Sequence, residues 1–245
     1  MSYRELAPPP ALAAYVACLW TRSGPPARIL PDGCVDVVWT GAELIVAGPA
    51  TRAVLPTLPP GEPKIGLRFR VGAAGAALGL PAGELLDRSP PLADVRAGGA
   101  EWSARIAGAP DAGARLRLLA AMVAGWLADA PAPDPVVRAA VHDLAQPRTR
   151  VAELCARLGI SERQLRRRFE GAVGYAPRTL AGVLRLQRFL TLAGPGGDLA
   201  RLAADAGYAD QPHLTRDCAR LAGLPAGALL AAGAGPAGER RLSSV

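Results

Sequence analysis

The stretch that decides the fold is VAELCARLGISERQLRRRF, residues 151–169. Its first part places apolar side chains at helical spacing until Gly159, the residue type best able to take a sharp turn. Ser161 then begins a second helix, and Gln164 three residues later completes a Ser-x-x-Gln capping box, which satisfies two backbone N–H groups. A helix, a tight turn and a capped second helix together predict a helix-turn-helix unit.

The second predicted helix has two unlike faces. Leu165 and Phe169 share the inward face, because residues four apart are neighbours on a helix. The opposite face carries three arginines: Arg163, Arg166 and Arg167. Their guanidinium groups repel one another unless a polyanion neutralises them, and each planar group matches guanine or a phosphate. A solvated basic face is the alternative, but directly after a capped glycine turn we favour a DNA-reading face.

The same layout recurs after residue 199. Gly207 takes the place of the first turn, and Asp210 is the expected N-cap of the next helix. The outward face of that helix carries four polar residues: Gln211, His213, Arg216 and Arg220. Between the two units, residues 177–193 predict one long helix. Two such units on one rigid spacer indicate two DNA readers.

Basic charge gathers in the same half of the chain. The 245 residues carry 28 Lys+Arg against 21 Asp+Glu, a formal charge of +7. Residues 1–133 hold 12 basic and 11 acidic residues, whereas residues 134–245 hold 16 and 10. The three prolines of residues 129–135 predict a semi-rigid linker. We therefore expect three parts: an N-terminal domain over 1–130, an all-α domain over 134–232 and a disordered tail over 233–245.

The first half begins with strand patterns. Residues 35–39 and 64–70 largely alternate apolar and polar side chains, as half-buried strands do. Further along the chain the apolar residues recur at helical spacing, and residues 115–127 predict a helix that starts near Asp111. The expected fold class of this half is α+β, a small sheet followed by packing helices.

Residues 135–232 resemble the DNA-binding region of the AraC/XylS family of bacterial transcription regulators. The segments GISERQLRRRF (159–169) and GYADQPHLTR (207–216) fall where that family has its two recognition helices. The resemblance implies that both helices enter successive major-groove segments on one face of the duplex. It implies six base-reading candidates: Arg163, Arg166, Arg167, Gln211, His213 and Arg216. Arg220, on the outward face of the second helix, completes the expected set of DNA contacts.

Within this set, we expect Arg166 and Arg216 to read guanine and Gln211 to read adenine. For each residue a phosphate contact, which positions the protein without specifying a base, is the alternative. Cys218 departs from the family, which usually has a large aromatic residue there. The second unit is therefore expected to pack less tightly or to bind more weakly.

The first half resembles the N-terminal halves of a little-characterised AraC-like group, through residues 29–39, 48–51 and 66–70. In the AraC/XylS family this half is commonly a cupin-like domain for effector binding or dimerisation. Five residues of this half offer a ligand charged groups, a thiol and an aromatic side chain that could form a pocket wall. They form the candidate effector pocket: Asp32, Cys34, Asp36, Trp39 and Arg68. The alternative is structural, namely a Pro-Asp-Gly turn, a small buried cysteine and a core tryptophan.

The expected function is a sequence-specific transcription regulator of the AraC type, controlled by an unidentified ligand in the first half. Two alternatives stay open: an effector-independent repressor or architectural protein, and a thiol- or metal-responsive regulator that uses Cys18 and Cys34. The expected partner is double-stranded DNA. The resemblance leaves open a small-molecule effector, a homodimer and, for an activator, RNA polymerase.

Catalytic and membrane functions are not expected. The chain has only two histidines, His142 and His213, and lacks the H-E-x-x-H, G-x-S-x-G and P-loop motifs. Its four cysteines lie far apart, without metal-ligand spacing. We therefore expect no enzyme, no cofactor and no metal site. No apolar stretch approaches the ~20 residues of a membrane helix and no signal-peptide pattern begins the chain, so we expect a cytoplasmic protein.

Overall fold

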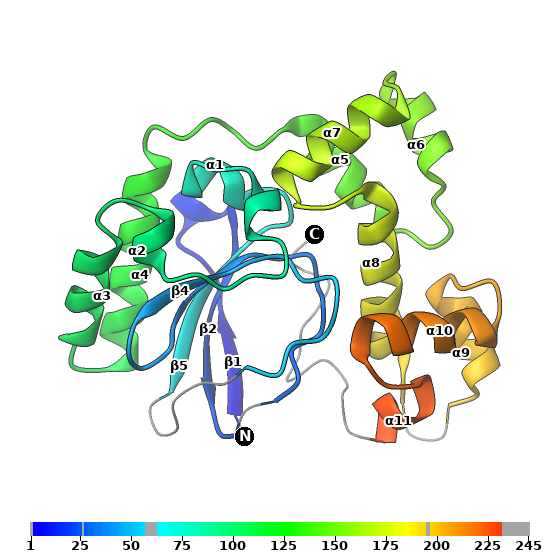
Figure 1. Cartoon of the computed structure of the whole chain (residues 1–245), viewed down its shortest axis with the longest axis horizontal. Helices are drawn as coiled ribbons and strands as arrows, with labels where there is room; N and C mark the ends of the chain where they lie inside the picture. Colours follow the sequence, from blue (N-terminus) through cyan, green and yellow to red (C-terminus); the bar gives the residue numbers. More distant parts are fainter. Residues whose placement is uncertain (1, 26, 57–62, 195–196, 232–245) are drawn as a thin grey trace.

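The computed structural model describes residues 2–25, 27–56, 63–194 and 197–231 (Figure 1). The strands of the first half are β1 (Ser2–Leu6), β2 (Val16–Ser23), β3 (Asp36–Trp39), β4 (Leu44–Ala47) and β5 (Lys64–Phe69). Its helices are η1 (Pro10–Leu12), α1 (Ala74–Leu78), η2 (Ala82–Leu85), α2 (Leu92–Val95), α3 (Gly99–Ala107) and α4 (Ala112–Leu127). The expected α+β class is confirmed. The tail expected over 233–245 lies outside the described residues.

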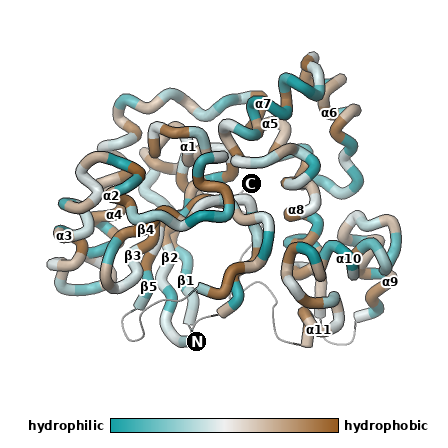
Figure 2. Tube along the Cα trace, viewed as in Figure 1, coloured by the Kyte–Doolittle hydropathy of each residue, from teal (hydrophilic) through white to brown (hydrophobic). Residues whose placement is uncertain are grey.

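The strands form one antiparallel sheet in the order β1-β2-β5-β3-β4. One face packs against α4, and Phe69 shares a buried cluster there with Leu119 and Val123. In Figure 2 brown stretches mark the middle of this sheet, beside α4. The N-cap of α4 is Asp111, as expected, and its Oδ1 accepts a hydrogen bond from the backbone N–H of Ala114 at 2.7 Å. The sheet and α4 therefore supply the core of this half.

The second face of the sheet is more polar. Alternate residues of a strand point to opposite faces, so Trp20 of β2 and Arg68 of β5 lie on the face away from α4. Arg68 is nevertheless only 5% exposed. Gly66 of β5 lies against Trp20, because a Cβ at this position would fall 2.3 Å from the indole ring. Glycine at 66 therefore leaves the space that the indole occupies.

The second half consists of helices in the described residues. They are α5 (Pro135–Leu144), α6 (Val151–Leu158), α7 (Glu162–Ala172), α8 (Pro177–Leu192), α9 (Leu199–Ala206), α10 (Gln211–Ala222) and α11 (Ala226–Ala231). Gly159 ends α6 with φ of 64°, and Gly207 ends α9 with φ of 91°, the left-handed conformation that favours glycine. Figure 1 shows α8 as a spacer with α6 and α7 at one end and α9 and α10 at the other. Both expected helix-turn-helix units and their long connecting helix are confirmed.

The two halves share part of a hydrophobic core. Leu30, Cys34 and Val71 of the first half belong to the same buried cluster as the inward residues of α8. Of residues 129–135, where the linker was expected, 129–134 contain neither helix nor strand, and Pro135 is the first residue of α5. The linker therefore joins two units that also pack directly against each other.

Candidate nucleic-acid interface and effector pocket

The first unit has the local geometry that its sequence predicts. The backbone N–H of Gln164 donates to Ser161 Oγ at 3.2 Å, and the N–H of Ser161 donates to Gln164 Oε1 at 2.9 Å, so the capping box is complete. Leu165 and Phe169 are fully buried, which fixes the inward face of α7. The opposite face of α7 is therefore held towards solvent.

The three arginines of that outer face are all exposed, but they are not equivalent. Arg166 Nε donates to Glu170 Oε1 at 2.7 Å, and this hydrogen bond and the nearby carboxylate raise the pKa of Arg166. Among the described residues, Arg163 and Arg167 make no ion pair or side-chain hydrogen bond. Arg166 must therefore leave an internal carboxylate to bind an external anion, whereas Arg163 and Arg167 need not.

A fourth arginine of α7 has a structural contact that the sequence reasoning missed. Arg168 Nη1 donates to Asp134 Oδ2 at 2.7 Å and so ties α7 to the N-terminus of α5. Burial by itself would raise the pKa of Asp134, but the hydrogen bonds from Arg168 and from the backbone N–H groups of Val136 and Val137 outweigh it, and the pKa is lowered. Asp134 thus caps α5 and also positions α7.

The second unit places its four candidate residues in two groups. Gln211 and Arg216 are exposed on α10. His213 is half-buried, its ring meets Tyr208 edge-on with centroids 5.1 Å apart, and its Nε2 lies 3.7 Å from Asp217 Oδ2. Asp217 also accepts a 2.8 Å hydrogen bond from Arg220. His213 and Arg220 are therefore gathered around one carboxylate, while Gln211 and Arg216 point outward.

Asp217 is a second residue that the sequence reasoning missed. It is 8% exposed, and Arg185 of α8 also approaches its Oδ2, at 3.5 Å. The spacing from His213 (i, i+4) and to Arg220 (i, i+3) was a signal for these contacts within α10, because such residues are neighbours on a helix. The contact with α8 had no sequence signal. Asp217 thus links α10 to the spacer helix.

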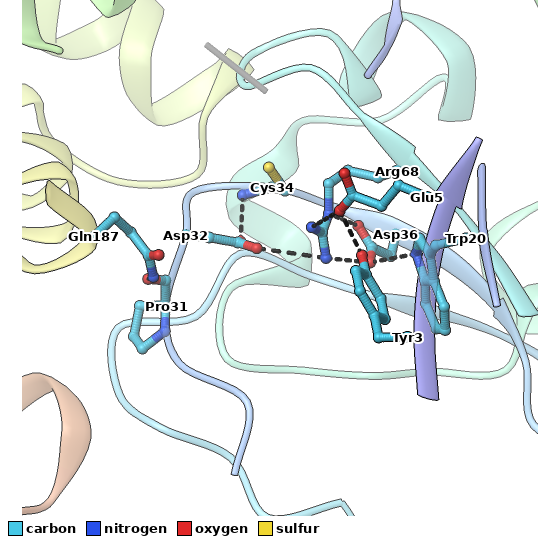
Figure 3. Close-up of polar contacts among 9 residues, drawn as sticks. All are labelled: Tyr3, Glu5, Trp20, Pro31, Asp32, Cys34, Asp36, Arg68 and Gln187. Carbon is cyan, nitrogen blue, oxygen red and sulfur yellow. Dashed lines mark hydrogen bonds and ion pairs between the residues drawn. The ribbon is translucent and has the colours of Figure 1, made fainter. Parts of the chain in front are cut away.

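The candidate pocket centres on a buried arginine on the second face of the sheet (Figure 3). Arg68 donates twice to Asp36, Nε to Oδ1 at 3.0 Å and Nη2 to Oδ2 at 2.9 Å. Trp20 Nε1 donates to the same carboxylate at 3.0 Å. Two further carboxylates lie near the guanidinium, Asp32 at 3.5 Å and Glu5 at 3.9 Å. The pKa of Arg68 stays well above its usual value, because these carboxylates outweigh the opposing effect of burial.

A cavity of about 140 Å³ lies beside this group. Four of the five expected pocket residues line it: Asp32, Cys34, Asp36 and Arg68. Trp39 does not, so that expectation was wrong. The strand alternation of β3 sends Asp36 and Val38 to this face and Trp39 to the other, where it is 2% exposed in the core beside α4. The structural alternative for Trp39 was therefore the correct one.

A larger groove of about 580 Å³ lies between the loop after β5 and α5. Arg70, Arg138 and His142 line it, and none of the expected pocket residues does. Size alone would favour this groove as the candidate effector pocket. Among the described residues, buried polar groups converge beside apolar walls in the smaller cavity, which therefore stays the candidate effector pocket.

Comparison with known proteins identifies part of the chain. Residues 154–232 match the family model described as a helix-turn-helix domain, which covers both units and α8. Residues 154–232 are thus similar to an AraC-type helix-turn-helix domain. Residues 4–91 match a family described as a domain of unknown function, DUF6597. The AraC-type domain supports a DNA-binding transcription regulator.

The fold was also compared with solved structures. A crystal structure of an apo variant of ToxT from Vibrio cholerae is 11% identical, with a TM-score of 0.46 over 86% of this chain and 96% of that one. ToxT from Vibrio cholerae O395 is 10% identical, with a TM-score of 0.41 over 86% and 95%. The comparison with curated proteins gave no match.

Three further features bear on the remaining expectations. Cys18 and Cys34 are both buried, at 7% and 6% exposure. Within the described ranges no group of three or more His, Cys, Asp or Glu residues is arranged to hold a metal ion. None of the helices described is long and apolar enough to cross a membrane. The burial of both thiols disfavours the thiol-responsive alternative.

We expect Cys18 to resist thiol labelling in the native protein. Burial raises the pKa of Cys18 to about 12, despite the opposing effect of Arg68, so near neutral pH it stays an unreactive thiol. Iodoacetamide should modify Cys18 only after denaturant is added, as peptide mass spectrometry would show. Labelling of the native protein at the rate of an unfolded peptide would revive the thiol-responsive alternative.

Proposed function

We propose that this chain is a sequence-specific transcription regulator of the AraC type that reads two major-groove segments with α7 and α10 and responds to a ligand in the pocket beside Arg68. The observation that carries the proposal is a pair of N-capped helices, α7 and α10, each of which follows a glycine turn at one end of α8. At about 1.5 Å per residue, the 16 residues of α8 span about 24 Å. Helices that flank such a spacer suit groove segments one turn, about 34 Å, apart.

We assign the reading roles by the exposure and the contacts of each side chain. Arg163, Arg167 and Arg216 are the first candidates for base or phosphate contacts, with Gln211 for adenine. His213 and Arg220 are already engaged with Asp217, so we assign them to positioning α10 and to backbone phosphates. In this scheme residues 134–232 bind DNA and residues 1–130 hold the ligand.

In vitro selection from random DNA with the full chain, followed by footprinting, tests the DNA-reading role. We expect an enriched motif and two protected segments one helical turn apart per bound chain. Affinity should fall with salt, by about −0.9 in the log-log slope for each neutralised phosphate. Recovery of no motif, or protection that ignores sequence, would argue for an architectural DNA-binding protein instead.

Arg166→Ala should weaken binding to the selected site by about tenfold to a hundredfold and relax one base position, if Arg166 reads guanine. The matched control is Glu170→Gln, which frees Arg166 from its helix partner and should leave affinity unchanged or raised. Both variants are measured on the selected site and on single-base variants of it. A uniform loss across all sequences would make Arg166 a phosphate contact.

A thermal-shift screen of the full chain tests the ligand. At least one compound of a broad panel should raise the melting temperature of the wild-type protein and lose that effect in Ala47→Phe, where the larger side chain enters the pocket that Ala47 lines. Ala121→Phe, on the exposed face of α4, is the control. A panel without any such compound would favour the effector-independent alternative.

A further inference from the structure

Two segments of the first half form a short bridge between the pocket and the AraC-type domain. The N–H of Ile29 donates to Val54 O at 2.8 Å, and the N–H of Val54 donates to Ile29 O at 2.9 Å. Both residues line the pocket beside Arg68. We call this pair of segments, residues 28–31 and 53–54, the pocket bridge. One side of the bridge, with Ile29, Leu30, Pro31 and Val54, forms part of the pocket wall.

The other side of the pocket bridge holds the end of α10. The N–H of Ala53 donates to Leu221 O at 2.7 Å, and Arg28 Nη1 donates to Ala222 O at 3.1 Å. Leu221 and Ala222 are the last residues of α10, where backbone carbonyls have no partner within the helix. A guanidinium is also favourable beside the negative end of a helix dipole. The pocket bridge therefore supplies the C-terminal cap of the second recognition helix.

A third contact joins the same bridge to the spacer helix. Gln187 of α8, 8% exposed, donates to Pro31 O at 2.5 Å (Figure 3). The next residue along the chain is Asp32, which lies 3.5 Å from Arg68 at the pocket. A displacement of the bridge by a ligand must therefore either move α8 and α10 with it or break these hydrogen bonds.

The first recognition helix is held by different elements. In the first half α7 contacts η2 and α1, and neither contributes a residue to the lining of the pocket. The connection from the pocket is therefore unequal: hydrogen bonds run from the bridge directly to the end of α10, whereas η2 and α1, the elements of the first half that α7 contacts, do not line the pocket.

We propose that the second recognition helix senses pocket occupancy through the pocket bridge, so that a ligand changes the contact of α10 with its half-site more than that of α7. The proposal rests on the function proposed above, and it specifies how the pocket regulates DNA reading. The hydrogen bonds from Arg28 and Ala53 to the end of α10 can be kept or lost as the pocket fills. They are therefore the contacts that differ between the empty and the filled state.

Hydrogen exchange of the full chain without DNA tests the coupling. Ala47→Phe serves as the filled state, because the phenyl group occupies the space that a ligand would take, and Ala121→Phe on α4 is the control. We expect the amides of residues 219–223 to change their exchange rate by about fivefold or more in the filled variant, while the amides of α7 stay as in the wild type.

The coupling should disappear when the bridge is cut. In an Arg28→Ala background, and separately in Ala53→Pro, which lacks the N–H that reaches Leu221, filling the pocket should no longer change exchange at residues 219–223. An unchanged α10 in Ala47→Phe, or an equal response of α7 and α10, would overturn the proposal. Because no DNA is present, a coupling that persists while DNA selection fails would support the bridge and reject the DNA-reading role.

Discussion

Replacing Arg68 by methionine should lower the free energy of unfolding by about 3–5 kcal/mol, since it leaves a buried carboxylate without its charge partner. Asp36 is 9% exposed and receives two hydrogen bonds from Arg68. Asp32 and Glu5 also lie within 4 Å of the guanidinium, so its removal takes the neighbouring cation from three carboxylates. Urea denaturation followed by circular dichroism measures the loss.

Two further variants separate the ion pair from the loss of side-chain volume. Arg68→Met combined with Asp36→Asn should recover much of the stability, because the neutral amide no longer requires a cation and can still accept from Trp20. Arg4→Met, at an exposed position of β1, should change stability little. Equal losses in the single and double variants would mean that packing of the arginine stem, rather than the charge, holds this face of the sheet together.

Removing both Arg163 and Arg167 should reduce affinity for the selected DNA by about a hundredfold or more, since each guanidinium contributes a base or phosphate contact. These two side chains are exposed on α7 and, within the described structure, bind no carboxylate. The double alanine variant should also flatten the salt dependence by about one unit of slope for each lost phosphate contact. Competition binding at several salt concentrations measures both quantities.

The control for this pair removes the same charge from another surface. Arg105 and Arg117 are exposed on α3 and α4, so their double alanine variant has the same net charge as the Arg163/Arg167 variant. It should keep the affinity of the wild type. If both double variants lost affinity equally, the overall charge of the protein, and not the outer face of α7, would govern DNA binding.

Local features were predictable from the sequence because a few neighbouring residues encode them. The capping box of Ser161 and Gln164 and the N-caps Asp111 and Asp210 all form as predicted. Each depends on a side chain and backbone groups two or three residues away, so no distant part of the chain needs to be known. The same holds for the left-handed turn at Gly159.

The pocket was predictable only in part. Asp32, Cys34, Asp36 and Arg68 do meet, because the antiparallel pairing of β3 with β5 brings Asp36 opposite Arg68. Trp39 was wrongly included, although it lies three residues from Asp36 and the period of two already sends it to the other face. Glu5 and Trp20 were missed, since nothing in the sequence shows that β2 pairs with β5 or that β1 pairs with β2.

By itself the sequence determined the two helix-turn-helix units, their spacer and the basic outer face of α7, since helical period, caps and glycine turns are short-range properties. The tertiary structure decided which arginines carry internal partners, and it placed the pocket bridge against α10. The bond from Arg28 to Ala222 joins residues 194 positions apart, and that from Gln187 to Pro31 spans 156. Such contacts arise only when two separately folded surfaces pack together, and no local pattern encodes that packing.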